Sequence, residues 1–141
     1  MLNVVTALLM MVGAAIQPSV DRYAVGQVWE YRTRPGDEGS LLKIQRVEPY
    51  PNAPAGDALR VYHISIIGVR LGPEHAPTDL QHLPVSEVTL DASVTRRSES
   101  RAAFPTSDEG IAEWRAAQGG VFTISVAEIV GIVDQTVSQH Q

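Results

Sequence analysis

Apolar and polar residues alternate along residues 24–33, where one face of an extended chain would carry Val25, Trp29 and Tyr31. A period of two is typical of a half-buried β-strand. The next segment, Pro-Gly-Asp-Glu-Gly at 35–39, is typical of a tight turn, because proline presets φ and glycine accepts positive φ. Apolar residues return over 41–48. The pattern therefore predicts an antiparallel hairpin with strands at 24–33 and 41–48.

Residues 59–71 are rich in β-branched side chains and predict a third strand, with Gly68 at a bulge or bend. Two segments beside it carry turn-forming residues. The proline-rich stretch 48–57 and the stretch 72–83 are both predicted to be loops.

From Pro84 onward the apolar spacing becomes helical. Ser86 is expected to cap a first helix that runs toward Val94. A second helix is predicted over 107–118, because two acids open it and two glycines follow it. A short strand is expected at 121–125, where Ser125 would cap the last helix. That helix carries an apolar stripe of Val126, Ile129, Val130, Val133 and Val137.

Strands that precede helices indicate an α+β fold. We expect an antiparallel sheet of three or more strands, followed by two or three helices packed on one face. The chain is predicted to hold a single domain over 22–138, preceded by a signal peptide or apolar extension at 1–18. Trp29 or Tyr31 should pack against the stripe residues Ile129 and Val133, because a one-faced sheet must be covered by its own helices.

The apolar run at 4–16 is shorter than the roughly 20 residues that a membrane-spanning helix needs. It fits the hydrophobic region of a secretory signal and ends near the small residues Gly13 and Ala15, although no Lys or Arg precedes it. This predicts a periplasmic or secreted protein that meets a membrane only through this segment. The alternatives are a misassigned start near Tyr23, which would make the protein cytoplasmic, or a structural first helix. We expect residues 1–16 to contribute nothing to the core.

Composition narrows the chemistry further. The chain has 141 residues and no cysteine, which excludes disulfides, thiolate nucleophiles and cysteine-ligated metal sites. Its net charge of −5 argues against a nucleic-acid partner, since phosphate binding needs a basic face. No cofactor is predicted.

Charged residues concentrate around the predicted turn, at Glu30, Arg32, Arg34, Asp37 and Glu38. Such a set either recognises a charged ligand through bidentate arginine or forms an ion-pair network that fixes the hairpin. In the second case, Arg34 and Glu38 should tie down the turn at 35–39. The candidate residues for binding a ligand or partner are Tyr31, Arg32, Arg34, Glu38 and His82.

Histidines offer a different chemistry. His75 and His82 flank Asp79 in the predicted loop, but no HxH or HExxH spacing aligns two imidazoles, so no metal site is predicted. His82 and Ser86 could instead form a nucleophile and base near a helix start, although no GxSxG elbow is present.

Four stretches together resemble a family of small uncharacterised bacterial proteins: VGQVWEYRTRPGDEGS at 25–40, HISIIGVRL at 63–71, HLPVSEVTLDASVT at 82–95 and EWRAAQGGVFTISVAEIV at 113–130. The resemblance covers most of the chain from Tyr23 and implies a common domain. It implies no activity, and members of that family begin close to the first strand.

Two functions remain open at this point. The first is a small non-enzymatic binding or interaction domain for a protein or a small polar ligand. The second is a small hydrolase or metal-dependent enzyme centred on His63, His82, Asp79 and Ser86, which requires these side chains to converge.

Overall fold

The computed structural model describes residues 22–140, so the predictions for the apolar run at 4–16 lie outside the described residues. Five strands and three helices follow one another along this part of the chain. They are β1 (Val28–Tyr31), β2 (Leu41–Pro49), β3 (Arg60–Leu71), β4 (Ala76–Val85), α2 (Glu87–Ser93), β5 (Val94–Ser98), α3 (Asp108–Ala116) and α4 (Val126–Gln139).

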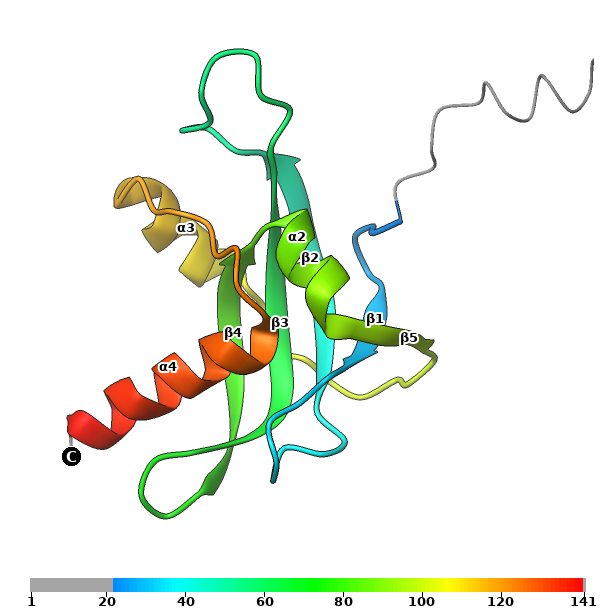
Figure 1. The fold of residues 1–141 in the computed structure, drawn as a ribbon, viewed down its shortest axis with the longest axis vertical. Coiled ribbons are helices and arrows are strands. Elements are labelled where there is room, and N and C mark those ends of the chain that lie inside the picture. Colours follow the sequence, from blue (N-terminus) through cyan, green and yellow to red (C-terminus); the bar gives the residue numbers. More distant parts are fainter. Residues whose placement is uncertain (1–21, 141) are drawn as a thin grey trace, which may run out of the picture.

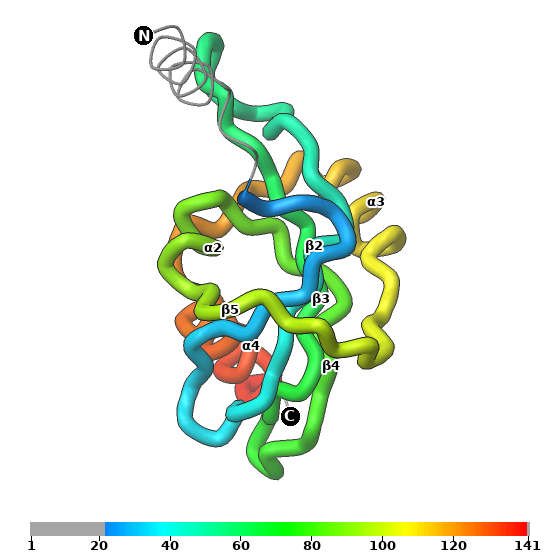
Figure 2. The backbone as a smooth tube through the Cα atoms, turned by 90° about the vertical axis from the view of Figure 1, so that its right-hand side faces the viewer, coloured from blue at the N-terminus to red at the C-terminus, as the bar shows by residue number. Residues whose placement is uncertain are grey.

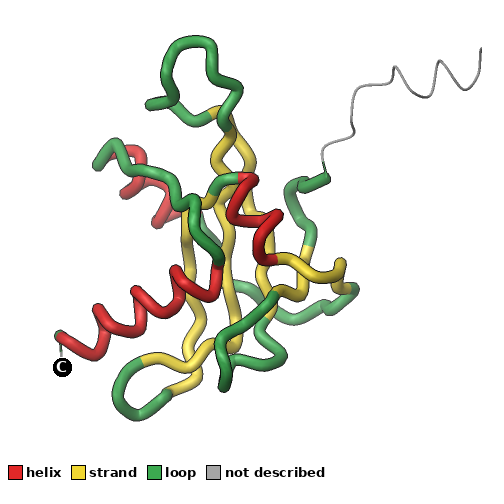
Figure 3. The backbone as a smooth tube through the Cα atoms, viewed as in Figure 1, coloured by secondary structure: helices red, strands yellow, loops and turns green. Residues whose placement is uncertain are grey.

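The strands form one antiparallel sheet in the order β4-β3-β2-β1-β5, so β4 and β5 are its two edges (Figures 1 and 3). The expected α+β fold, an antiparallel sheet with helices that follow the strands, is confirmed. None of the three helices described is long and apolar enough to cross a membrane.

One face of the sheet carries the main hydrophobic core. Helices α2 and α4 lie on this face, and α4 packs across β3 (Figure 2). The core includes Ile44 of β2, Ile64 of β3 and Val85 of β4, each fully buried. Leu90 of α2 and Ile129 of α4 close it from above.

Helix α3 lies on the opposite face of the sheet from α2 and α4 (Figure 2). The interior strand β3 is therefore covered on both sides, and residues 61–66 are buried without interruption. Tyr62 and Ile64 point into the main core, whereas Val61, His63 and Ser65 belong to the face under α3.

The prediction of a loop at 72–83 is wrong, because most of this segment forms β4. Its prolines, Pro73 and Pro77, indicated a loop from the sequence. An edge strand accepts proline, since one side of its backbone needs no partner in the sheet. The sequence pattern also gave no sign of β5, which begins at Val94 and pairs with β1 across the sheet.

Smaller differences concern element ends. β1 begins only at Val28, after Gly26 takes a positive φ of 92° and donates its N–H to the Ile44 carbonyl. The expected strand at 121–125 is reduced to a single parallel bridge between Val85 and Phe122. The predicted caps are confirmed: Ser86 accepts from the N–H of Thr89, and Ser125 accepts from that of Glu128.

Trp29 and Tyr31 both belong to the core cluster that contains Ile129, and Val133 packs against this cluster. The ring of Trp29 meets Tyr23 edge to face, with 5.6 Å between the ring centroids. The core cluster thus includes residues of both the first strand and the last helix, and a direct contact of Trp29 or Tyr31 with Ile129 or Val133 stays a prediction.

We predict that Trp29→Ala lowers the free energy of unfolding by about 3–5 kcal/mol, because it removes a large side chain that is only 6% exposed. Val25→Ala, at a site 61% exposed, should change it by less than about 0.5 kcal/mol. Urea denaturation of both variants measures the difference. Similar small losses in both would place Trp29 at the surface.

Candidate functional site

Three ionisable side chains form a row across the sheet on the face under α3, one from each of three neighbouring strands. His63 of β3 stands in the middle. Its Nε2 lies 2.9 Å from Oε1 of Glu48 on β2, and its Nδ1 lies 2.8 Å from Nε2 of His82 on β4. The row therefore runs Glu48–His63–His82, and His63 has no exposed surface.

Two β-bulges on either side of His63 accompany this row. In β2, Ile44 pairs with Ile64 but Arg46 pairs with His63, so one extra residue, Gln45, enters the strand. The side chain of Glu48 consequently reaches the face under α3. In β4, an extra residue lies between Leu83 and Leu80, next to His82. Bulges of this kind redirect side chains and occur often beside functional sites.

The chemistry of the groups fixes the direction of the hydrogen bonds. An ionised carboxylate only accepts, so His63 donates from Nε2 to Glu48. In the neutral ring, Nδ1 of His63 then accepts from Nε2 of His82. This leaves Nδ1 of His82 without a proton, at the α3 end of the row.

Two residues of α3 complete the cluster. Arg115 binds the second oxygen of Glu48 through its guanidinium, and Trp114 meets the His63 ring edge to face, with 4.9 Å between centroids. Burial alone would raise the pKa of Glu48, but the hydrogen bonds from His63 and Arg115 outweigh it and lower that pKa. Glu48 is therefore a carboxylate at neutral pH.

Both histidines favour the neutral form. Burial lowers the pKa of His63, and the carboxylate of Glu48 offsets this only in part. Burial, with a further contribution from His63, lowers the pKa of His82 to about 4. At neutral pH the row thus holds one negative charge on Glu48, balanced by Arg115.

A second polar cluster continues from the row along the same face. Ser65 donates to the carbonyl of Gln81 and lies 2.9 Å from the hydroxyl of Ser107. Gln45 donates to Ser65 and to the carbonyl of Pro105. These bonds attach the segment before α3 to the sheet, and no buried side-chain N or O atom within residues 22–140 lacks a partner.

A groove runs along the open edge of β4 beside His82. It has a volume of about 500 Å³ and is bounded by α3 and by Val133 of α4. Gly110 of α3 sits directly over His82: a Cβ at this glycine would lie 2.5 Å from the Cβ of His82. The lining residues are Leu80, Gln81, His82, Leu83, Pro84, Gly110, Glu113, Trp114 and Val133.

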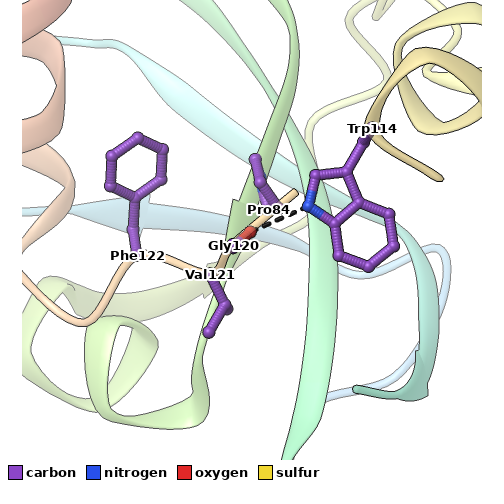
Figure 4. A pocket seen from close by; sticks show the side chains of 5 residues that line it. All are labelled: Pro84, Trp114, Gly120, Val121 and Phe122. Carbon is purple, nitrogen blue, oxygen red and sulfur yellow. Dashed lines mark hydrogen bonds between the residues drawn. The ribbon is translucent and has the colours of Figure 1, made fainter. Parts of the chain in front are cut away.

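An apolar pocket of about 360 Å³ adjoins this groove and shares Pro84 and Trp114 with it. Figure 4 shows Trp114 on one side of Pro84 and Phe122 on the other, with Val121 between them. The indole N–H of Trp114 donates to the carbonyl of Gly120 at 2.8 Å, which fixes the ring at the pocket wall. Together, the groove and pocket combine apolar surface with one histidine and one exposed carboxylate, Glu113.

The charged hairpin turn has a structural arrangement. Arg34 uses all its donor nitrogens, Nε to Asp37 at 2.8 Å, Nη1 to Asp134 at 3.0 Å and Nη2 to the Arg70 carbonyl at 2.8 Å. The carboxylate of Glu38 accepts the N–H of Gly36. Arg34 and Glu38 thus tie down the turn, as expected, although they do so separately.

The other candidate residues lie apart from one another. The Tyr31 hydroxyl is buried 2.7 Å from that of Ser40, and burial raises its pKa to about 12. Arg32 is exposed and donates to the carbonyl of Ala92. The cavity beside Arg34 and the groove beside His82 share no lining residue, so the five candidates do not form a single site.

The four residues of the enzyme hypothesis converge only in part. His63 and His82 meet directly, whereas Asp79 accepts the backbone N–H of Gly68 and Ser86 is buried as the cap of α2. No group of three or more His, Cys, Asp or Glu residues suited to a metal ion occurs within the described part of the chain.

Sequence reasoning overlooked three members of the site. Glu48 falls at the boundary between the strand predicted at 41–48 and the loop predicted at 48–57, and Trp114 and Arg115 fall within the helix predicted at 107–118. Nothing local marks Glu48, because its orientation depends on the bulge at Gln45. The two glycines after α3 could have indicated that a large side chain packs there, since Gly119 lies against the ring of Trp114.

No protein-family model, curated protein or solved structure matches this chain. Function therefore has to be inferred from the geometry itself.

We predict that Gly110→Ala lowers the free energy of unfolding by about 1–3 kcal/mol, because the new methyl group collides with His82 and moves α3 off the sheet. Gly131→Ala in α4 is the matched control. Its Cβ would meet nothing within 4 Å, so the better helix propensity of alanine should stabilise the protein by up to about 1 kcal/mol. If urea denaturation shows the same stabilisation for both, α3 does not approach β4 this closely.

We also predict that acid destabilises the fold through His82. Its pKa is about 4 when folded and about 6.5 when unfolded, so the unfolded chain binds more protons between these values. The free energy of unfolding should be fully retained above pH 6.5 and should fall by roughly 2–3 kcal/mol as the pH drops to 4.

Chemical denaturation at a series of pH values measures this slope, to which His63 contributes in the same direction. His82→Gln should flatten it, whereas His75→Gln, at an exposed residue outside the network, should not. An unchanged slope in His82→Gln would show that His82 does not titrate in this way.

Proposed function

We propose that this protein is a small non-enzymatic binding domain whose binding site is the groove along β4 with its adjoining pocket. The observation that carries this proposal is the combination of an open sheet edge with an apolar pocket fixed by Trp114. Leu80 to Pro84 form the floor, and α3 supplies one wall. A partner would place an apolar group between Trp114 and Phe122 and a hydrogen-bond donor toward Nδ1 of His82.

Rigid support favours binding over a purely structural role for this surface. The ring of Trp114 is held by its bond to Gly120, and His82 is held by His63. Side chains that are already ordered lose little conformational entropy when a ligand arrives. The partner is a protein segment or a small ligand that combines polar and apolar groups.

Direct measurement can test this proposal. A random peptide library displayed on phage would be selected on the full chain, and a selected peptide titrated by calorimetry. Val121→Asp, which puts a carboxylate into the pocket, should weaken binding by at least about tenfold. Val25→Asp, at an exposed residue outside both cavities, should not. If the selected peptides bind the Val121→Asp variant as tightly as the wild type, they bind elsewhere on the protein, and the proposal is refuted.

The alternative is an acid–base enzyme centred on His82. The specific observation in its favour is the row Glu48–His63–His82, which orients an imidazole as a catalytic base is oriented. A general base works best with a pKa near the working pH, and at about 4 His82 is a weak base at neutral pH. No nucleophile contacts it among the described residues, since Ser86 caps α2.

Ester hydrolysis separates the two functions. Under the binding proposal, p-nitrophenyl acetate should be cleaved at the same rate by the wild type and by His82→Gln. A rate that falls by more than about 100-fold in His82→Gln, the scale of a lost general base, would favour the enzyme.

The compartment is a proposal that rests on residues 4–16 alone. We propose export, on the match of that segment to a signal sequence in length and in its small terminal residues.

A further inference from the structure

We propose that the β5 edge of the sheet is a second docking site, which takes an acidic polypeptide segment in extended conformation. This site lies at the opposite edge from the β4 groove and does not depend on the function proposed for that groove.

Positive charge gathers at this edge although the whole chain carries −5. The basic residues on β5 or close to it are Arg22, Arg32, Arg96, Arg97 and Arg101, against the three carboxylates of Glu30, Asp91 and Glu99. Helix α3, over the other part of the sheet, carries Asp108, Glu109 and Glu113 against one arginine, Arg115. The two ends of the sheet thus differ in the sign of their charge.

Arg97 is prepared to receive a carboxylate. Its guanidinium stacks over the ring of Trp29, 5.6 Å from the centroid, and Trp29 is itself fixed in the core. Stacking on an aromatic face orients a guanidinium and leaves its N–H groups free at the edges. The side chain is exposed, so a partner can reach it.

Much of this charge is not neutralised within the protein. Arg96 pairs with Glu30, and Arg22 lies near Asp91. Among residues 22–140, no carboxylate lies within ion-pair distance of Arg32, Arg97 or Arg101. At Arg32, Arg97 and Arg101, a partner that supplies carboxylates would therefore form new ion pairs without displacing existing ones, whereas at Arg96 it would share the guanidinium with Glu30.

The backbone favours an extended partner. Within residues 22–140, β5 pairs with β1 on one side, and its other side is a sheet edge (Figure 2). An added strand would hydrogen-bond to this edge, and its alternate side chains would reach Arg96 and Arg97, which point to opposite faces. Acidic residues along such a segment complement both arginines.

The test uses the full chain and a fluorescein-labelled peptide, Val-Val-Glu-Glu-Glu-Val-Val, whose adjacent glutamates would face both sides of the sheet, with its Lys-Val counterpart as control. Fluorescence anisotropy should show binding of the acidic peptide only, weakened severalfold when salt rises from about 20 to 150 mM. The double variant Arg96→Gln/Arg97→Gln should raise Kd at least tenfold. Arg70→Gln, which removes one exposed strand arginine away from β5, should change Kd less than twofold.

Amide chemical shifts of the ¹⁵N-labelled wild type locate the peptide without relying on variants, and the changes should centre on residues 94–98. Shifts centred on β4, equal binding of the Lys-Val peptide, or no binding of the acidic peptide at low salt would each overturn the proposal. Tighter binding of a single-stranded oligonucleotide would assign the edge to nucleic acid. If the wild type self-associates, the double variant does not, and the acidic peptide does not bind, the β5 edge pairs with a second copy of this chain. Either of these two results would overturn the proposal of an acidic partner.

Discussion

The arrangement of the face under α3 follows from one constraint, the burial of polar side chains in β3. His63 and Ser65 of β3 have no exposed surface. A buried polar group left without a partner costs about 1–3 kcal/mol, so both must be hydrogen-bonded. Glu48 and His82 satisfy the two nitrogens of His63, and Ser107 with the carbonyl of Gln81 satisfies Ser65. These partners come from β2, β4 and the segment before α3, so the same bonds determine how α3 lies on the sheet.

The contacts that hold α3 on the sheet therefore both stabilise the fold and form the groove. α3 reaches β4 only because Gly110 has no side chain, and it then supplies Trp114 to the groove wall and Arg115 to Glu48. Anything that charges the histidines would oppose the packing of α3, because both are neutral in the folded chain. A pKa near 4 also argues that the row serves packing and orientation more than proton transfer at neutral pH. His82 is oriented by His63 and Glu48, and the low pKa of His82 is the reason that we propose binding before catalysis.

Local sequence predicted the parts of the fold that local physics determines. Three local patterns each predicted an element: the alternation around Trp29, the β-branched run of β3, and the helix caps Ser86 and Ser125. The sequence also identified His63 and His82 as candidate residues. It could not predict that they meet, because their contact depends on strand order and on bulges that no local pattern encodes. β4 was missed because prolines on an edge strand resemble those of a loop. β5 was missed because its only partner, β1, is far away in sequence.

The two edges of the sheet solve the same problem by different means. An unpaired edge invites pairing with another chain, and proteins discourage this with proline, with charge or by covering the strand. β4 carries Pro77 and Pro84, and Phe122 pairs with its end. β5 has no proline and relies on Arg96 and Arg97. Arginines repel a second basic edge as strongly as they attract an acidic strand. The same arginines that would oppose pairing between two copies of this protein would thereby also set the charge of the partner proposed for this edge.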